Sequence, residues 1–351
     1  MKKLIAIFVV SVLLITNLVP SFATSAVHES KIIEALQKVE YIKDDMGLSD
    51  INFEEISISN PVYTYEYIDN TFIQSRIMYP LKINNKLIAW AITMENDDTS
   101  EFQITTALVK EVNLILTTEM EITFIYDYEH CYLFNGNEFY LIRKNALKVE
   151  GRSILETDKA EAITADLHLA NINSSIALNY SAATTPRAPI YYSCSVGFVS
   201  QNPPSNLCWA ASVACIVNYR KDKNYTATQV AQKHFGETNF NNGVSPSDIP
   251  SILLTDYLMF FFSYKNEVPS GSAILHNIVE DFPIYASFKH SNGYHAVVIY
   301  GINVSGGYLS IMDPEFGFCT ASPTTSGYRY VSGYSGVTLT FARAVCRYWS
   351  A

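Results

Sequence analysis

Cys208 is the residue in this sequence that is best placed to act as a nucleophile. It follows a turn-like stretch at residues 201–206 and opens an apolar stretch at residues 208–217, which predicts a helix beginning at Cys208. The first turn of a helix offers free backbone N–H groups and the positive end of the helix dipole, and both favour a thiolate. A helical Cys without other signals is better explained as a packing residue, so the interpretation depends on its partners.

His295 and Asp313 are the partners that could complete the site. His295 lies near the start of a predicted buried strand at residues 293–301, and Asp313 ends a second predicted strand at residues 308–313. An antiparallel pair of these strands can place Asp313 beside His295. We expect the carboxylate to accept the Nδ1 proton, which would leave Nε2 to face the thiolate. Each residue alone has a structural explanation, whereas the order Cys, His, Asp predicts a triad.

The motifs around these residues resemble those of papain-like cysteine peptidases. The similar stretches are Gln201, the run Cys-Trp-Ala-Ala from Cys208, the run Tyr-His-Ala-Val-Val-Ile-Tyr-Gly around His295, and Asp313 with the Pro that follows. The resemblance covers residues 190–351 and is strongest to bacterial secreted branches, namely staphopain-like enzymes and peptidases that process bacteriocin leaders. It implies catalytic roles for Cys208, His295, Asp313 and Gln201 in the hydrolysis of a protein or peptide substrate.

In fold, the resemblance implies an α+β, two-lobed catalytic domain in which a helical lobe carries Cys208 and an antiparallel β-lobe carries His295 and Asp313. In mechanism, it implies a thioester acyl-enzyme, with the Gln201 side chain and the backbone N–H of Cys208 binding the oxyanion. The spacing from Gln201 to Cys208 is one residue longer than in papain, and Asn206 is a weaker substitute for Gln201. The third member is Asp where papain has Asn.

Two other functions remain open for the same residues. One is a non-catalytic binding protein built on a peptidase fold. The other is acyl transfer, as in transglutaminase-like enzymes, which also use Cys, His and Asp. Those enzymes usually have Trp after His-Ala, whereas Val297 follows here.

The remaining His and Cys residues carry weaker signals. We expect His290 to lie in an exposed turn or at the cleft rim, His276 to be structural, and His234 to have no acidic partner. Disulfides Cys319–Cys346 and Cys194–Cys215 are both possible in an exported chain. The six Cys residues form no paired C-x-x-C motif, so the sequence predicts no metal site and no cofactor.

The first residues have the layout of a secretory signal peptide. Met1 and two Lys residues precede an apolar stretch at residues 4–19, and small residues follow up to Ala23. We therefore predict a signal peptide at residues 1–23 and a secreted, extracellular protein with no membrane association after cleavage. An uncleaved anchor is the alternative.

Residues 24–180 predict a small α+β unit with one amphipathic helix at residues 29–46 and a largely antiparallel sheet. The predicted strands are 64–67, 77–83, 87–93, 102–106, 122–128, 132–134 and 139–143, with a second helix at 106–116. Residues 150–180 are expected to form a loose helical connector. Residues 181–189 are small, polar and proline-bearing, which indicates a linker to the catalytic domain at 190–351.

Charge separates the two units. Residues 27–180 carry 12 Lys and Arg against 25 Asp and Glu, while residues 181–351 carry 10 against 9. The net charge of −10 argues against a nucleic-acid partner. The resemblance to exported papain-like enzymes implies that the first unit is an inhibitory pro-domain, and we expect it to cover the cleft until cleavage near residues 181–190. An independent binding domain is the alternative.

Overall fold

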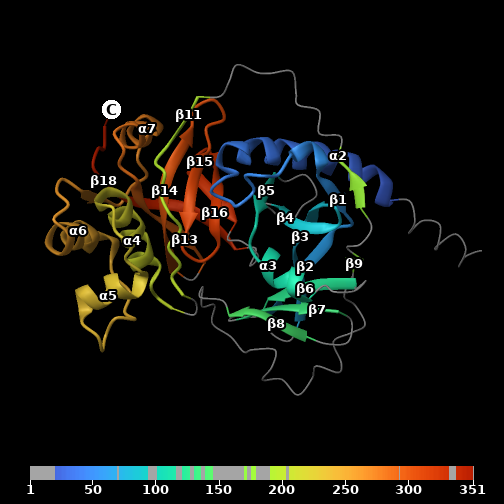
Figure 1. The fold of residues 1–351 in the computed structure, drawn as a ribbon, viewed down its shortest axis with the longest axis horizontal. Helices are drawn as coiled ribbons and strands as arrows, with labels where there is room; N and C mark the ends of the chain where they lie inside the picture. The colour runs from blue at the N-terminus through green and yellow to red at the C-terminus, as the bar shows by residue number, and fades with distance from the viewer. Residues whose placement is uncertain are drawn as a thin grey trace, which may run out of the picture.

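The structure is a computed structural model with two parts (Figure 1). We call the described residues between 20 and 178 the N-terminal part and those between 190 and 350 the C-terminal part. The described residues are 20–68, 71–93, 101–115, 121–126, 130–135, 139–144, 170–171, 175–178, 190–202, 205–291, 293–331 and 337–350. Residues 1–19 of the predicted signal peptide and the whole predicted linker lie outside them.

A long helix, α2 (Pro20–Val39), begins the N-terminal part. Ile32, Leu36 and Val39 recur at helical spacing and are fully or almost fully buried. The helix predicted at residues 29–46 is therefore confirmed up to Val39, where the chain tightens into the 3-10 helix η1 (Glu40–Ile42). Toward the amino terminus, α2 extends back through the end of the predicted signal peptide.

The sheet of the N-terminal part follows the predicted strands closely. The remaining elements are η2 (Phe53–Glu55), β1 (Ser57–Ser59), β2 (Val62–Ile68), β3 (Thr71–Ile83), β4 (Lys86–Thr93), β5 (Phe102–Thr105), α3 (Val109–Ile115), β6 (Glu121–Tyr126), β7 (His130–Phe134), β8 (Phe139–Lys144), β9 (Ala170–Asn171) and β10 (Ser175–Ala177). The strand order is β10-β1-β3-β2-β6-β7-β8, with β4 joining β3 to β5. Pairing is antiparallel except between β2 and β6.

One prediction for this part is wrong where the structure describes it. The sequence predicts a loose helical connector at residues 150–180, but residues 170–171 and 175–177 form β9 and β10, and apart from Leu178 the rest of the stretch lies outside the described residues. Strand β10 pairs with β1 and places Ile176 opposite Ile58. Because β1 is more than a hundred residues away in the sequence, local propensity gives no sign of this pairing.

The C-terminal part is built on a closed sheet. Its strands are β11 (Tyr191–Ser193), β12 (Ser263–Lys265), β13 (Ile284–His290), β14 (Gly293–Asn303), β15 (Leu309–Asp313), β16 (Gly317–Thr324), β17 (Gly327–Val331) and β18 (Thr338–Cys346). The order β14-β13-β18-β17-β16-β15 returns to β14, because β14 also pairs with β15. Antiparallel pairing around this ring brings the ends of β14, β15 and β17 into one buried region.

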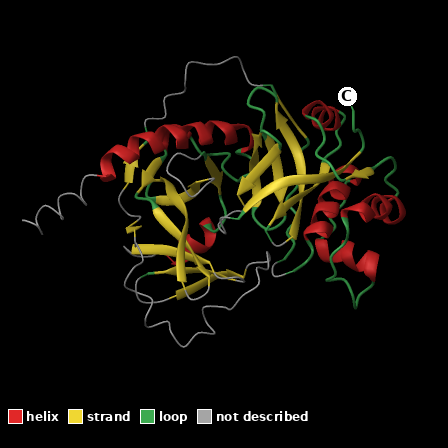
Figure 2. Cartoon of the chain, turned by 180° about the vertical axis from the view of Figure 1, so that it is seen from behind, coloured by secondary structure: helices red, strands yellow, loops and turns green. Residues whose placement is uncertain are grey.

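Helices cover one side of the closed sheet (Figure 2). They are α4 (Cys208–Lys221), α5 (Ala227–Phe235), η5 (Pro246–Asp248), α6 (Ile249–Tyr257) and α7 (Gly271–Val279). Helix α4 buries every residue from Trp209 to Val217 and packs against β13 and β14, as well as against α5 and α6. A helix that is apolar on all sides needs such cover. The mixed helix and strand content confirms the predicted α+β class.

The N-terminal part packs against the other side of the closed sheet (Figures 1 and 2). Helix α2 and strand β5 contact β16. The Gln103 side chain bonds both backbone polar groups of Val331, and Arg76 donates to Thr338 at 2.9 Å. One continuous apolar core includes buried residues of both parts. The N-terminal part is therefore integrated with the sheet that carries His295.

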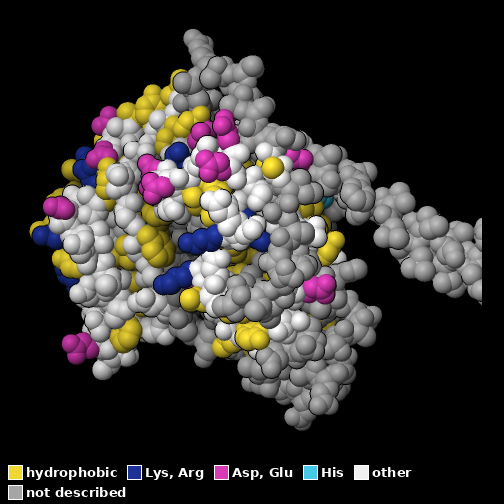
Figure 3. All heavy atoms as spheres, turned by 45° about the vertical axis from the view of Figure 1, so that its right-hand side comes forward, with side chains coloured by type: hydrophobic (Ala, Val, Ile, Leu, Met, Phe, Trp, Pro, Cys, Tyr) yellow, Lys and Arg dark blue, Asp and Glu magenta, His cyan; other side chains and the backbone are white. Residues whose placement is uncertain are grey.

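The face in Figure 3 displays charges of both signs: described acidic side chains lie mostly in its upper half, and Lys and Arg side chains lie near its centre and at its left edge. In the part of the chain that the structure describes, no helix combines the length and the apolar character needed to cross a membrane.

Candidate active site

Cys208 is the first residue of α4, as the sequence predicts. Leu207 precedes it as the N-cap residue, and its side chain makes no hydrogen bond to the first N–H groups of the helix. The side chain of Cys208 is half-buried, while Trp209 beside it is buried and donates its indole N–H to the Asn242 carbonyl at 2.9 Å. Because α4 is packed along its length, Cys208 is held in a fixed position at the first residue of the helix.

His295 lies on β14, opposite Phe288 of β13, and only 1% of its surface is exposed. Its Nε2 atom is 2.8 Å from Oδ1 of Asp313. The predicted pairing through Nδ1 is therefore wrong. Met312 lies opposite Val298, so Asp313 lies at the level of Val297, two residues along β14 from His295. Two residues of a strand span roughly 7 Å, a distance that favours Nε2, the ring nitrogen farther from the backbone.

The other side of the His295 ring is available to the nucleophile. The Cys208 side chain is close enough to His295 to raise its pKa, and with Nε2 bound to Asp313 the ring nitrogen left to face Cys208 is Nδ1. Burial lowers the pKa of His295, but the Asp313 carboxylate and Cys208 outweigh it, so the pKa lies well above its usual range. A protonated His295 between Cys208 and Asp313 is thereby stabilised.

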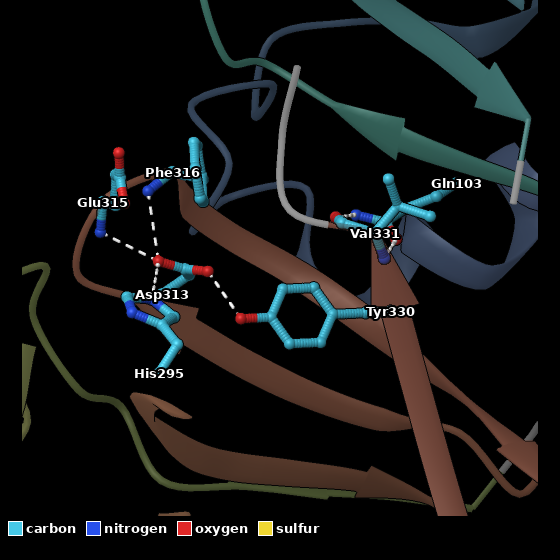
Figure 4. Close-up of polar contacts among 7 residues, drawn as sticks. All are labelled: Gln103, His295, Asp313, Glu315, Phe316, Tyr330 and Val331. Carbon is cyan, nitrogen blue, oxygen red and sulfur yellow. Dashed lines mark hydrogen bonds and ion pairs between the residues drawn. The ribbon is translucent and has the colours of Figure 1, made fainter. Parts of the chain in front are cut away.

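Asp313 is fully buried at the end of β15, and both of its oxygens are occupied (Figure 4). Oδ1 accepts from His295 and from the backbone N–H groups of Glu315 at 2.8 Å and Phe316 at 3.3 Å. Oδ2 accepts a hydrogen bond from the Tyr330 hydroxyl, with 2.7 Å between the two oxygens. Burial raises the pKa of Asp313, but His295 and the hydrogen bonds outweigh it and lower the pKa below its usual value.

Gln201 is 1% exposed and is fixed beside the end of β15, because its backbone N–H donates to the Pro314 carbonyl at 3.0 Å. Its side-chain Oε1 is buried without a hydrogen-bond partner among the described residues. Asn206, the substitute considered from the sequence, instead bonds Asn241 through both its backbone N–H and its side chain. Of the two, Gln201 is the residue with a buried side-chain oxygen that makes no hydrogen bond among the described residues.

Sequence reasoning missed the groups that hold Asp313. The Glu315 and Phe316 N–H groups follow from an Asp-Pro-x-x-Gly pattern, in which an Asp side chain accepts from the turn that follows it. Gly317 ends this turn with φ 93°, a conformation that favours glycine. Tyr330 has no such signal, because its contact joins strands β17 and β15 across the intervening β16.

Two predictions for other His residues are wrong. His290 ends strand β13, is 9% exposed, and has its pKa lowered by burial and by His295, so the exposed turn is wrong, while a position at the cleft rim stays a prediction. His234 has an acidic partner, because α6 brings Asp256 within 3.3 Å of its Nδ1 atom. His276 stacks on Tyr348 with ring centroids 4.4 Å apart, which agrees with a structural role.

All six Cys residues are free, so neither disulfide considered from the sequence is formed. Burial raises the pKa of both Cys194 and Cys346 to about 12. It also raises the pKa of Cys215 and Cys319. Among the described residues, no group of three or more His, Cys, Asp or Glu is placed to hold a metal ion.

Comparison with known proteins bears on this part of the chain. Residues 194–325 match the family of the papain-like cysteine protease AvrRpt2. This match supports a papain-like cysteine peptidase family and a peptidase activity, and it spans Gln201, Cys208, His295 and Asp313. Tyr330 lies beyond its end. No curated protein matches the chain. The staphopain-like and bacteriocin-processing branches stay predictions.

Proposed function

We propose that this protein is a secreted cysteine endopeptidase in which Cys208, His295 and Asp313 form the catalytic triad. The observation that carries the proposal is the buried His295 ring, whose Nε2 is hydrogen-bonded to Asp313 and whose pKa is raised by both Asp313 and Cys208. A base held between a nucleophile and an orienting carboxylate is the arrangement that acyl transfer needs.

The catalytic steps follow from this geometry. The Cys208 thiolate attacks the scissile carbonyl, and the oxyanion accepts from the Cys208 backbone N–H and the Gln201 side-chain amide. The tetrahedral species collapses to a thioester, and His295 gives its Nδ1 proton to the departing amine. Water then attacks the thioester while His295 accepts the water proton, which releases the acid and restores Cys208.

The position of the site supports a two-lobed arrangement of the catalytic domain. Helix α4 carries Cys208, and the closed sheet carries His295 and Asp313 on strands β14 and β15. A peptide bound where the end of α4 meets the ends of these strands would present its carbonyl to Cys208. The substrate class follows from the family as protein or peptide.

Labelling of Cys208 tests the triad. We expect iodoacetamide at near-neutral pH to modify Cys208 in preference to the other Cys residues, which are buried. His295→Ala should lower the labelling rate about 100-fold, in line with the loss of a general base. His276→Ala is the matched control, because His276 stacks on Tyr348 away from Cys208, and its labelling should equal that of the wild type. Equal labelling of the two variants would contradict the proposal.

Products distinguish hydrolysis from the other two functions. We expect fragments when protein that has been cut in residues 181–189 is incubated with a protein substrate and a primary amine. Crosslinks or amine incorporation in place of fragments would indicate acyl transfer. Selective labelling of Cys208 without either product would indicate a binding protein.

The zymogen is the second half of the proposal. We infer that residues 1–23 direct export and that residues 24–180 are an inhibitory pro-domain, with activity released by cleavage near residues 181–190. Its supports are the position and size of the N-terminal part and its acidic charge beside a nearly neutral C-terminal part. Amino-terminal sequencing of the secreted wild type and of Cys208→Ala tests it. We expect wild-type protein to begin near residue 190 and the variant to keep the N-terminal part. The same amino terminus in both would argue against self-processing.

A further inference from the structure

Tyr330 has a specific geometric relation to the catalytic carboxylate. Its side chain is fully buried, and its hydroxyl donates to Oδ2 of Asp313 at 2.7 Å. Three other donors, from His295, Glu315 and Phe316, all bind Oδ1. Among the described residues, Tyr330 is thus the one residue that donates a hydrogen bond to Oδ2. The two-sided binding fixes the rotation of the carboxylate about its Cβ–Cγ bond.

The residue after Tyr330 is held by the N-terminal part (Figure 4). The Gln103 amide donates to the Val331 carbonyl at 3.0 Å and accepts from the Val331 N–H at 2.9 Å. Gln103 comes from β5, is 4% exposed, and lies opposite Ile92 of β4. The Gln103 side chain therefore binds the end of β17 as a neighbouring strand would, through a reciprocal pair of bonds.

Apolar packing makes a second connection to the carboxylate. Phe316 and Val331 are buried in a cluster whose other buried members, including Trp90 and Phe124, all come from the N-terminal part. Phe316 also supplies one of the backbone N–H groups that bind Asp313. The N-terminal part thus contacts Phe316, which binds the carboxylate, and Val331, the neighbour of Tyr330, each by a different kind of interaction.

We propose that Tyr330 is a positioning residue for Asp313, and that the N-terminal part keeps it in place through Gln103 on Val331 and through the packing around Phe316. This inference rests on the proposed cysteine peptidase function. The N-terminal part then supports the triad from the side of the sheet opposite α4. Its described contacts are with the closed sheet. Through these contacts it influences the position of the catalytic carboxylate, in addition to the inhibitory role proposed above.

Charge determines the sign of the expected effect. The titratable groups that face Asp313 are His295 on β14, Cys319 on β16, Tyr330 on β17 and Glu315 in the turn. His295 and the Tyr330 hydrogen bond both lower the pKa of Asp313 against its burial. Removing the hydroxyl should raise that pKa, so Asp313 takes up a proton at a higher pH. A protonated Asp313 no longer stabilises the His295 imidazolium beside the Cys208 thiolate.

The test is the pH profile of Cys208 alkylation by iodoacetamide in the full chain. Tyr330→Phe keeps the ring and removes the hydroxyl. We expect the alkylation rate near neutral pH to fall about tenfold, the effect of one lost hydrogen bond to a charged group. The acid limb of the profile should move to higher pH, which a purely structural role would not cause. With a peptide substrate and the chain cut in residues 181–189, kcat should fall and KM should stay unchanged.

Gln103→Met tests the coupling, because Met keeps most of the volume and removes both bonds to Val331. We expect the alkylation rate to fall about threefold and the acid limb to move in the same direction. The effect is smaller than that of Tyr330→Phe because Gln103 contacts Val331, the neighbour of Tyr330, and not Tyr330 itself. If Gln103→Met does not fold, Phe316→Leu tests the same coupling through the apolar cluster. Tyr41→Ala is the matched control, because it removes a contact between the two parts at Tyr191, on β11, and should leave the profile unchanged.

The outcomes separate this inference from the proposed function. A wild-type chain without preferential labelling of Cys208 would overturn the proposed function and this inference with it. Normal wild-type labelling with an unshifted acid limb in Tyr330→Phe would overturn the positioning role alone. A shift in Tyr330→Phe together with wild-type behaviour in Gln103→Met, or in Phe316→Leu where that replaces it, would overturn the role of the N-terminal part.

Discussion

The closed sheet of the C-terminal part has two neighbours that contribute in different ways. On β13 and β14 it meets α4, which carries Cys208. On β16 and β17 it meets the N-terminal part, which carries no member of the proposed triad but binds Val331 next to Tyr330. The first neighbour supplies a reactive group, while the second supplies contacts that fix a carboxylate. If both proposals hold, the catalytic site depends on a region that contains none of its chemistry.

The difference also concerns the kind of residue involved. A nucleophilic Cys at a helix start can be identified from its residue type and position. Gln103 and Tyr330 are singled out by where their side chains lie, which residue type alone does not indicate. The comparison can be tested on each side of the sheet and at a site remote from both.

The largest effect is expected at Asp313. Asp313→Ala removes the acceptor that His295 shares with three other donors, from Glu315, Phe316 and Tyr330, so we expect kcat/KM to fall about 100-fold or more. Asp313→Asn should cost only about tenfold, because its amide oxygen can replace Oδ1 and its amide group can donate to the Tyr330 oxygen. Steady-state kinetics on a peptide substrate measures both. Equal losses in the two variants would contradict this assignment of the oxygens.

The pH dependence of Asp313→Asn has a definite sign. The carboxylate raises the pKa of His295, so removing its charge lowers that pKa. The imidazolium is then lost at a lower pH, and the alkaline limb of the kcat/KM profile should move to lower pH. An unchanged alkaline limb would show that Asp313 does not interact electrostatically with His295 during catalysis.

An intermediate effect is expected on the side of the N-terminal part. A specific protease site placed within residues 181–189 allows the chain to be cut there. We expect the two fragments to elute together in gel filtration at micromolar concentration, because they share a continuous apolar core and the Gln103 bonds to Val331. Gln103→Met should lower the affinity of the cut fragments by about tenfold, as expected for two buried polar groups left unpaired.

A matched surface variant serves as the control for the cut chain. Lys38→Ala removes ion pairs with Glu34 and Glu101 that lie within the N-terminal part and are partly exposed, so the fragment affinity should stay at the wild-type value. Separate elution of the wild-type fragments would mean that the N-terminal part is a detachable domain, and that the contacts on Val331 contribute little.

Much of the fold and part of the site could be predicted from the sequence, and the limits have physical causes. Alternation and apolar runs indicated most strands, and the helix at Cys208 followed from its apolar stretch. The pairing of β10 with β1 and the closure of β14 on β15 depend on partners that are distant in the chain. The choice of Nε2 over Nδ1 depends on strand register, which the sequence motif does not encode.

The smallest effect is expected at His276, which lies on α7 and stacks on Tyr348 at an interplanar angle of 2°. His276→Ala should lower the free energy of unfolding by about 1 kcal/mol, the contribution typical of a paired ring contact. Activity should stay at the wild-type level, because the His276–Tyr348 pair belongs neither to α4 nor to the N-terminal part. Denaturant unfolding and steady-state kinetics of the same preparation measure both quantities. A loss of kcat in His276→Ala would show that α7 also influences the triad, and that the division between the two sides of the sheet is too simple.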